Sequence, residues 1–296
     1  MLKQNLHTHT SYDHGKDTVE EMIQAALDQG FTTLGFSGHG TNKPLAPTSM
    51  SSENQLAYKQ AIREAKEKYK DQIDLFMGIE QDSMAPFEDD ELDYKIGSVH
   101  YMCKDGRVEP VDDNPKLFEQ IRDEMYDGSI EKMVTAYYQS VEDMMDFQNF
   151  DIVGHIDLIS KFNENEEYFG FEEPWYLEAA FHAIQKGIDQ GLIFEMNTGA
   201  VARGNRKTAY PSDALLHYMA DHNAMLVVDT DCHDRKYLDC LMDESIERAR
   251  KAGFRHLMRL SKDGFVPEPI ENFQKEARVL NPKRPAGTGL KRPYLR

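Results

Sequence analysis

Long apolar runs and paired cysteines are both missing from this sequence. No run approaches the ~18 apolar residues of a membrane helix, and the segment before His7 lacks the apolar stretch of a signal peptide. The three cysteines, Cys103, Cys232 and Cys240, are an odd number without a CxxC spacing. This argues against a disulfide framework and for a reducing compartment. The sequence therefore predicts a cytoplasmic protein that does not enter a membrane.

Positive charge is also scarce. Lysine and arginine number 34 against 52 aspartate and glutamate residues, which gives a formal net charge of -18. A surface of this sign repels polyanions and disfavours nucleic acid and anionic membranes as partners. A small phosphorylated substrate stays compatible, because a bound metal or an arginine reverses the field locally. The sequence does not report the oligomeric state, and a homo-oligomer stays open.

The chain does contain a regular alternation of short apolar runs with helical patterns. Such alternation predicts right-handed crossovers between parallel strands. Seven strands in series within 296 residues favour one α/β domain, a distorted (β/α)7 TIM-like barrel, over two small domains. The expected strands lie around Leu6 and at Thr33–Ser37, Ile73–Glu80, Ile96–His100, Ile152–Ile156, Leu192–Asn197 and Met225–Asp229.

Caps and composition set the first helix and the limits of the domain. Thr18 with Glu21 three residues later has the spacing of a capping box, which predicts a helix that ends at Gly30. A helix at Asp243–Gly253 and a hairpin at His256–Pro269 close the barrel domain, which we assign to residues 1–270. Residues 271–296 form a basic C-terminal extension that we expect to be flexible.

The positions of the histidines carry the functional signal. Seven of the eleven fall at or just after the end of an expected strand, and in a barrel these ends meet on one face, where active sites are built. Glu80 ends another strand, and Asp231 is two residues before a histidine. We therefore predict a metal centre, and expect the other four histidines to be surface or packing residues. The seven are His7, His9, His14, His39, His100, His155 and His233, and the four are His182, His217, His222 and His256.

Six motifs, in chain order, resemble those of a known superfamily. They are HTHTSYDHG, the Gly38-His39 pair, GIEQD, GSVHY, GHIDL and TDCHD. Over the span from Leu6 to Pro269 they resemble the successive motifs of the polymerase and histidinol phosphatase (PHP) superfamily. The stretches EMNTGAVARGNRKTAYPS and RLSKDGFVPEPI are most similar to its histidinol-phosphate phosphatase branch. Cys232 departs from the small residue usual at its position, and we expect its side chain to face the barrel wall.

The resemblance implies a barrel that holds up to three divalent metal ions. Mixed nitrogen and oxygen ligands suit zinc, manganese or iron better than magnesium or calcium. Carried onto this sequence, the first ion would be held by His7, His9, Glu80 and Asp231, the second by Glu80, His100 and His155, and the third by His14, His39 and His233.

The activity that the resemblance implies is hydrolysis of L-histidinol phosphate to L-histidinol and phosphate, a step of histidine biosynthesis. A hydroxide that bridges two metal ions would attack phosphorus, because metal-bound water loses a proton near neutral pH. We expect Arg203 to bind the phosphate through its forked donors, with Arg206 and Lys161 as further candidates. Asp82, on the same side of its strand as Glu80, could orient a ligand, protonate the leaving group or bind a substrate amine.

Two other hypotheses stay open. The metal centre could act on another small phosphate ester, such as a nucleotide or a sugar phosphate, or on a phosphotyrosyl protein. A metal-binding scaffold without turnover, a protein of another class, would keep the same barrel, although the complete ligand set argues against it. An exonuclease is disfavoured, because an acidic surface repels long polyanions.

Overall fold

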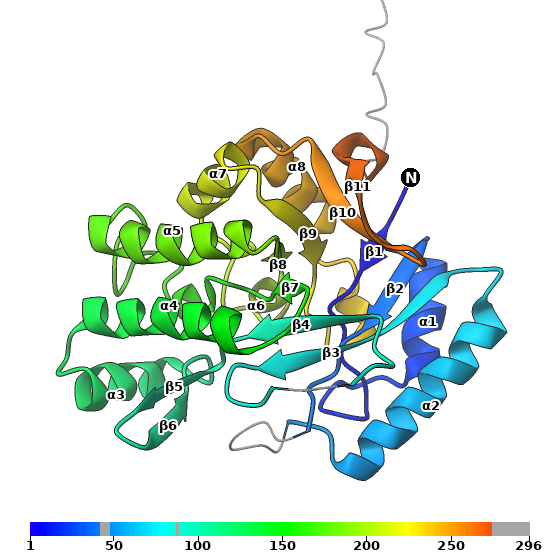
Figure 1. Cartoon of the computed structure of the whole chain (residues 1–296), viewed down its shortest axis with the longest axis horizontal. Helices are drawn as coiled ribbons and strands as arrows, with labels where there is room; N and C mark the ends of the chain where they lie inside the picture. The colour runs from blue at the N-terminus through cyan, green and yellow to red at the C-terminus, as the bar shows by residue number, and fades with distance from the viewer. Residues whose placement is uncertain (42–47, 87–88, 274–296) are drawn as a thin grey trace, which may run out of the picture.

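Seven parallel strands form one sheet that curves into a nearly closed barrel, surrounded by helices (Figure 1). This computed structural model describes residues 1–41, 48–86 and 89–273. The strands pair in the order β1-β2-β3-β4-β7-β8-β9, and each pairing is parallel. The fold class predicted from the sequence is therefore confirmed. The strands are β1 (Gln4–Asn5), β2 (Thr33–Phe36), β3 (Asp74–Asp82), β4 (Tyr94–Ser98), β7 (Ile152–Val153), β8 (Ile193–Asn197) and β9 (Met225–Asp229).

The barrel closes between its first and last strands, just beyond their ends. Thr8 and Cys232 form a parallel bridge. The His9 amide donates to the Cys232 carbonyl at 2.8 Å, and the Cys232 amide donates to the His7 carbonyl at 3.0 Å. The seam thus runs through the segments 7–9 and 231–233 and places these two ligand-bearing motifs side by side.

Apolar side chains fill the N-terminal end of the barrel. The predicted closing hairpin, β10 (His256–Ser261) paired with β11 (Gly264–Pro269), covers this end and is confirmed. Its Met258 and Leu260 join the apolar cluster. The side chain of Gln4 in β1 donates a hydrogen bond to the Met258 carbonyl and accepts one from the Leu260 amide, which links the hairpin to β1. The strand residues of the cluster are Leu6, Phe76, Tyr94, Ile96, Ile152, Ile193 and Val227. Polar side chains are thereby left to the opposite, C-terminal end.

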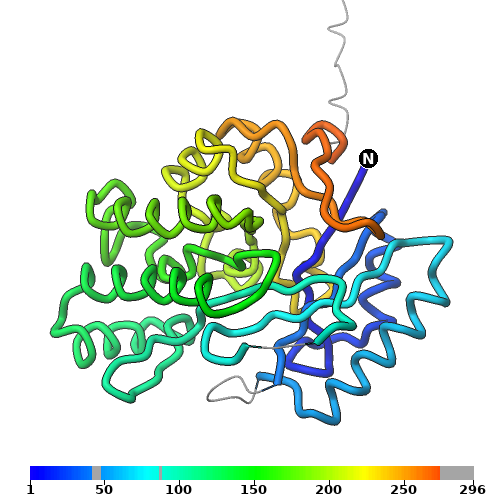
Figure 2. Tube along the Cα trace, viewed as in Figure 1, coloured from blue at the N-terminus to red at the C-terminus, as the bar shows by residue number. Residues whose placement is uncertain are grey.

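Helices cover the outside of the barrel, with α1 and α2 on one side and α3, α4 and α5 on the other (Figure 2). Their starts follow the local sequence: the predicted capping box of Thr18 and Glu21 is present at α1, and Ser51, Asn114 and Ser129 cap the next three. The helices are α1 (Val19–Asp28), α2 (Ser52–Tyr69), α3 (Pro115–Met125), α4 (Ile130–Phe147), α5 (Pro174–Asp189), α6 (Gly199–Ala202), α7 (Asp213–Asp221) and α8 (Met242–Ala252).

A small antiparallel hairpin after β4 was not expected from the sequence. It pairs β5 (Tyr101–Lys104) with β6 (Arg107–Pro110). Every residue of β6 is only partly buried, so the segment lacks the apolar run that identifies the barrel strands. The hairpin projects from the C-terminal end of the barrel and leads into Asp112 and Asp113.

The predicted C-terminal boundary of the barrel domain lies within a short turn. Residues 271–273 belong to the 3-10 turn η3 (Ile270–Phe273), so the boundary drawn at residue 270 stays a prediction. The rest of the expected basic extension, residues 274–296, lies outside the described residues.

Among the helices within the described ranges, none has the length and apolar character that crossing a membrane requires.

Candidate metal centre

The nine predicted ligand side chains converge at the C-terminal end of the barrel. Each of them lies near the C-terminal end of a strand or follows one, so the parallel arrangement of the strands brings them to the same face. The structure thus brings together every residue of the predicted set, and their assignment as ligands is our proposal. His7, His9 and His14 follow β1, His39 follows β2, Glu80 lies in β3, His100 follows β4, His155 follows β7, and Asp231 and His233 follow β9.

Glu80 lies at the middle of the group. Its Oε2 atom is 3.3 Å from His7 Nε2 and 2.9 Å from His39 Nδ1. Its Oε1 atom is 3.0 Å from His155 Nε2 and 3.2 Å from His100 Nε2. The two oxygens of one carboxylate therefore face two different sets of imidazoles. This is the arrangement that a carboxylate shared between two metal ions requires.

Asp231 supplies the second central carboxylate. Its Oδ1 atom is 3.3 Å from His9 Nε2 and 3.7 Å from His7 Nε2. The same oxygen is 3.4 Å from His233 Nδ1. Asp231 therefore faces the two histidines of the HTH motif across the seam of the barrel, as the first predicted ligand set requires.

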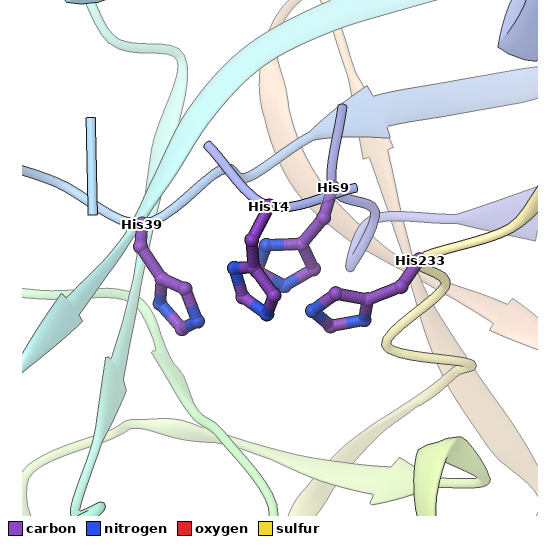
Figure 3. A group of neighbouring side chains, drawn as sticks. All are labelled: His9, His14, His39 and His233. Carbon is purple, nitrogen blue, oxygen red and sulfur yellow. The ribbon is translucent and has the colours of Figure 1, made fainter. Parts of the chain in front are cut away.

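Four histidines form a further compact group at the mouth of the barrel. His9, His14, His39 and His233 each offer a ring nitrogen within 4.8 Å of the others, and Figure 3 shows their rings gathered around one space. The rings of His9 and His233 stack with centroids 4.0 Å apart, and those of His14 and His39 with centroids 4.9 Å apart. Three of these are the third predicted ligand set, and His9 lies between that set and Glu80.

Unsatisfied buried atoms show that the cluster fits metal ions. His7 Nε2, His9 Nε2 and Glu80 Oε2 are buried, and no described residue gives any of them a hydrogen bond of good geometry. A buried polar atom left in this state costs about 1–3 kcal/mol. Ligand atoms of the same three residues also lie within 4.8 Å of one another. A mixed set of imidazole and carboxylate donors at this spacing suits zinc, manganese or iron.

Asp82 lies behind one of the ligand rings. Its Oδ2 atom is 3.0 Å from His100 Nδ1, and its Oδ1 atom accepts a hydrogen bond from the Met84 amide at 2.9 Å. A carboxylate in this place fixes the tautomer of the imidazole and directs the other ring nitrogen toward a metal. Of the three roles open for Asp82, the geometry favours the orientation of a ligand.

Two carboxylates that sequence analysis missed support the HTH motif in the same way. Asp13 Oδ2 is 2.6 Å from His9 Nδ1 and also accepts a hydrogen bond from the His39 amide at 3.0 Å. Glu195 Oε1 is 2.6 Å from His7 Nδ1. Both left a signal in the sequence. Asp13 is within the first motif, four residues after His9, and Glu195 is the one charged residue of β8, between the apolar Phe194 and Met196.

The carboxylates and imidazoles of the cluster stabilise each other's charged forms. Burial alone would raise the pKa of Glu80, but the surrounding imidazoles, His39 foremost, bring that pKa well below its ordinary value. Burial alone would lower the pKa of His9, yet the carboxylates around it, Asp13 foremost, raise this pKa to about 9. The carboxylates therefore stay ionised, and a metal ion that binds His9 displaces a proton.

The backbone is strained at two of the proposed ligands. His155 has φ 21° and Asp231 has φ 48°, a region that residues other than glycine adopt at a cost of order 1–3 kcal/mol. Gly199 lets the chain pass close to Asp231, because a Cβ there would stand 2.6 Å from Asp231 Oδ2 and 2.8 Å from Arg203 Nη2. The close contact of these two side chains thus depends on a glycine.

A cavity of about 710 Å³ opens over the cluster, and two of the three predicted phosphate-binding residues line it. Arg203 Nη2 donates to Asp231 Oδ2 at 2.8 Å. Lys161 Nζ donates to the carbonyl of Asp112 at 2.6 Å and to its Oδ2 at 2.9 Å. Both cations are therefore held at the rim of the cavity by an acidic neighbour.

Arg206 is not among the described residues that line the cavity. Its Nη1 donates to the Ser160 carbonyl at 2.9 Å and to Ser160 Oγ at 2.6 Å, and its guanidinium lies 5.0 Å from the centre of the Tyr210 ring. The side chain is 3% exposed. This geometry gives Arg206 the role of anchoring its own loop and does not support a contact with phosphate.

The remaining expectations concern residues outside the cluster. Cys232 is buried in an apolar group with Leu238 and Met242, and its Sγ donates to the Asp234 carbonyl at 3.1 Å, so it faces the barrel wall as expected. The four histidines predicted to lie outside the site are exposed, on helices, at the end of one, or in the closing hairpin: His182, His217, His222 and His256.

A parallel barrel with clustered imidazoles and carboxylates at its C-terminal end defines a class, the barrel enzymes that use several divalent metal ions. The sequence model of the PHP domain matches residues 5–199, more than half of the chain. The chain therefore belongs to the PHP domain family.

Comparison with known proteins agrees with this assignment. A Deinococcus radiodurans protein named "probable histidinol-phosphatase" is 29% identical over 272 residues, which cover 84% of this chain and 95% of the relative. The histidinol-phosphatase of Bacillus subtilis is 25% identical, with coverage of 84% and 100%. The crystal structure of histidinol phosphate phosphatase from Lactococcus lactis, complexed with zinc, L-histidinol and phosphate, has a TM-score of 0.68 at 19% identity and covers 89% of this chain and 98% of its own. The fold is thus shared over nearly its full extent.

Proposed function

We propose that this protein hydrolyses L-histidinol phosphate to L-histidinol and phosphate. The observation that carries the proposal is the ligand cluster on the floor of a cavity that also presents Arg203. Two further findings support it: relatives of similar length are named histidinol-phosphatases, and the Lactococcus lactis neighbour was solved with the two products of this reaction.

The reaction breaks the bond between phosphorus and the ester oxygen and adds water across it. Divalent ions held by the nine ligands would supply a deprotonated water as nucleophile and positive charge for the phosphoryl oxygens. Glu80 and Asp231 would hold those ions in the buried cluster, and Arg203 would turn its remaining N–H donors toward the phosphate. Guanidinium donors match the spacing of phosphate oxygens.

The cavity also suits a cationic leaving group. Three carboxylates outside the ligand set line it: Asp112, Asp113 and Asp234. Asp112 pairs with Lys161 at 2.9 Å, and Asp234 pairs with two lysines at 3.0 Å each. Asp113 accepts a hydrogen bond from Asn114 Nδ2 at 2.6 Å and pairs with no lysine or arginine of the described residues. We infer that Asp113 faces the ammonium group of the substrate.

Arg203→Ala is expected to weaken phosphate binding and to leave the metal content unchanged. A hydrogen bond to a charged group contributes about 1.5–3 kcal/mol, so kcat/KM should fall roughly ten- to a hundredfold, mainly through KM. Steady-state kinetics with metal analysis by mass spectrometry measure both quantities. Loss of metal in this variant would refute the role assigned to Arg203.

Asp113→Asn is expected to discriminate between substrates. For histidinol phosphate, whose leaving group carries an ammonium, KM should rise about two- to fivefold, the effect of one exposed ion pair. For p-nitrophenyl phosphate, whose leaving group has no cation, KM should stay the same. Asp263→Asn, in the turn at the far end of the barrel, is the matched control. An equal rise for both esters would contradict the placement of the ammonium group.

A panel of phosphate esters tests the proposed function itself. The wild-type protein, loaded with zinc, manganese or iron, is assayed for phosphate release from histidinol phosphate, nucleoside monophosphates, sugar phosphates and a phosphotyrosyl peptide. We expect the highest kcat/KM with histidinol phosphate. Turnover of another ester without turnover of histidinol phosphate would replace the substrate, and bound metal with no hydrolysis at all would favour a scaffold.

A further inference from the structure

Glu195 occupies a position in β8 where a charge needs a specific reason. Its neighbours along the strand, Phe194 and Met196, are fully buried apolar residues, and Glu195 itself is 0% exposed. No lysine or arginine of the described residues pairs with its carboxylate. A buried carboxylate is costly unless other groups compensate its charge, so its hydrogen-bond partners must define its role.

Both oxygens of Glu195 accept hydrogen bonds at the centre of the ligand cluster. Oε1 is 2.6 Å from His7 Nδ1. Oε2 accepts from the backbone amide of His155 at 2.7 Å and from Asn197 Nδ2 at 2.9 Å. The side chain therefore touches two proposed ligands, one through its ring and the other through its backbone.

The contact with His7 sets the tautomer of that imidazole. An acceptor 2.6 Å from Nδ1 keeps the proton on Nδ1. Nε2 is then the nitrogen whose lone pair is left for a metal ion, on the side of Glu80 Oε2, which is 3.3 Å away. A metal ligand needs this lone pair.

The contact with His155 sets a backbone conformation. At φ 21° His155 lies in a sparsely populated region, which persists only where surrounding contacts hold it. The amide of His155 is held by Glu195, and its ring reaches Glu80, with Nε2 3.0 Å from Oε1. The unusual turn is thus what brings this ring to the second face of Glu80.

We propose that Glu195 is a positioning residue that holds His7 and His155 ready for metal at the same time, and so couples the two metal positions that share Glu80. The proposal rests on the ligand assignment made above. A test by enzymatic activity also depends on the proposed phosphatase function, whereas a test by metal binding does not.

Substitution by glutamine separates this role from simple packing. Glutamine has the same shape but only one acceptor oxygen, and its amide group donates. If the amide nitrogen of the glutamine takes the place of Oε2, it faces the N–H groups of His155 and Asn197, which are also donors. If it faces His7, it meets Nδ1–H, and the conflict is relieved only when the proton moves to Nε2, which can then no longer bind metal. Aspartate is shorter, but it keeps two acceptors.

The test is therefore the order of three proteins: wild type, Glu195→Asp and Glu195→Gln. Zinc content after equilibrium dialysis against buffered zinc, kcat, and circular dichroism are measured for each. Loss of a carboxylate behind a ligand imidazole typically lowers metal affinity or activity 10–100-fold. We expect this loss at two positions in Glu195→Gln, an intermediate loss in Glu195→Asp, and retention of the ion bound by His14, His39 and His233, which Glu195 does not touch.

Glu142→Gln is the matched control. Glu142 is also a largely buried carboxylate whose Oε1 lies 2.7 Å from a histidine Nδ1, that of His182, but this pair is on the outer helices α4 and α5. We expect wild-type zinc binding and kcat for this variant.

Two outcomes would overturn the proposal. One is wild-type zinc affinity in Glu195→Gln. The other is better zinc binding in Glu195→Gln than in Glu195→Asp, which is the order that a packing role predicts. If Glu195→Gln does not fold, Glu195→Asp decides, since full zinc affinity at all positions in that variant would also reject the coupling. Failure of the wild type to hydrolyse histidinol phosphate would leave this metal-binding result standing and reject only the substrate.

Discussion

Glu80→Ala is expected to lose metal at two positions and to lose nearly all hydrolytic rate. One carboxylate faces both sets of imidazoles, with Oε2 3.3 Å from His7 Nε2 and Oε1 3.0 Å from His155 Nε2. Removal of its charge leaves these histidines without a shared anion. Metal ions contribute several kcal/mol of charge stabilisation to such a reaction, and each 1.36 kcal/mol is tenfold in rate. We therefore expect kcat to fall about 10³-fold or more.

The measurement pairs metal content by mass spectrometry with kcat for histidinol phosphate. Glu80→Gln refines it, because the amide keeps one acceptor oxygen and the size of the side chain but has no charge to share between two ions. Glu142→Ala, which removes a buried carboxylate on the outer helices, controls for general destabilisation. Full metal content in Glu80→Ala would contradict the bridging role, whatever the rate.

The barrel and its ligand face could be predicted because both depend on local patterns. The runs at Thr33–Ser37 and Ile73–Glu80 are short, apolar and separated by helical segments, and parallel strands of this kind place all their C-terminal ends on one face. A histidine that follows such a run is therefore placed near other such histidines by topology alone. The structure shows this for His39 and His100, which come from separate strands and have ring centroids 5.4 Å apart.

The residues that support the ligands were harder to predict. Glu195 and His7 are 188 positions apart in the chain, and their 2.6 Å contact depends on how β8 turns its side chains inside the barrel. Arg203 and Arg206 show the opposite case, in which residues close in the chain lie in different surroundings. They are neighbours in one loop, yet one lines the cavity and the other donates to Ser160. Proximity in sequence does not determine the direction of a side chain in a loop, whereas alternation along a strand does.

The hairpin β5–β6 was missed for a related reason. Its pairing is antiparallel and local, and its second strand is polar and only partly buried, so it carries no hydrophobic period. Yet it leads to Asp112 and Asp113 on the cavity wall. The residues expected to select the substrate thus follow an element that contributes little to the core, whereas the expected metal ligands follow the most buried strands.

Removal of the metal ions is expected to abolish hydrolysis and to lower the melting temperature. His7 Nε2 and His9 Nε2 are buried, and no described residue gives either of them a hydrogen bond of good geometry. An ion that binds only the folded state stabilises it by about 4 kcal/mol at a thousandfold excess over Kd, so chelation should lower Tm by on the order of 10 °C. Zinc, manganese or iron added back should restore both activity and Tm, while a stripped protein with unchanged Tm and rate would contradict a metal-dependent site.

The same cluster predicts how metal binding depends on pH. Asp13 and Asp231 raise the pKa of metal-free His9 to about 9, so this ring carries a proton at neutral pH that the metal must displace. Below pH 9, falling pH therefore favours the protonated, metal-free form, and each displaced proton lowers the apparent affinity about tenfold per pH unit. Zinc titrations in buffers of different ionisation enthalpy count the released protons. Asp13→Asn should reduce proton release at neutral pH because it removes the charge that holds the proton on His9, and an unchanged count would reject this account of the site.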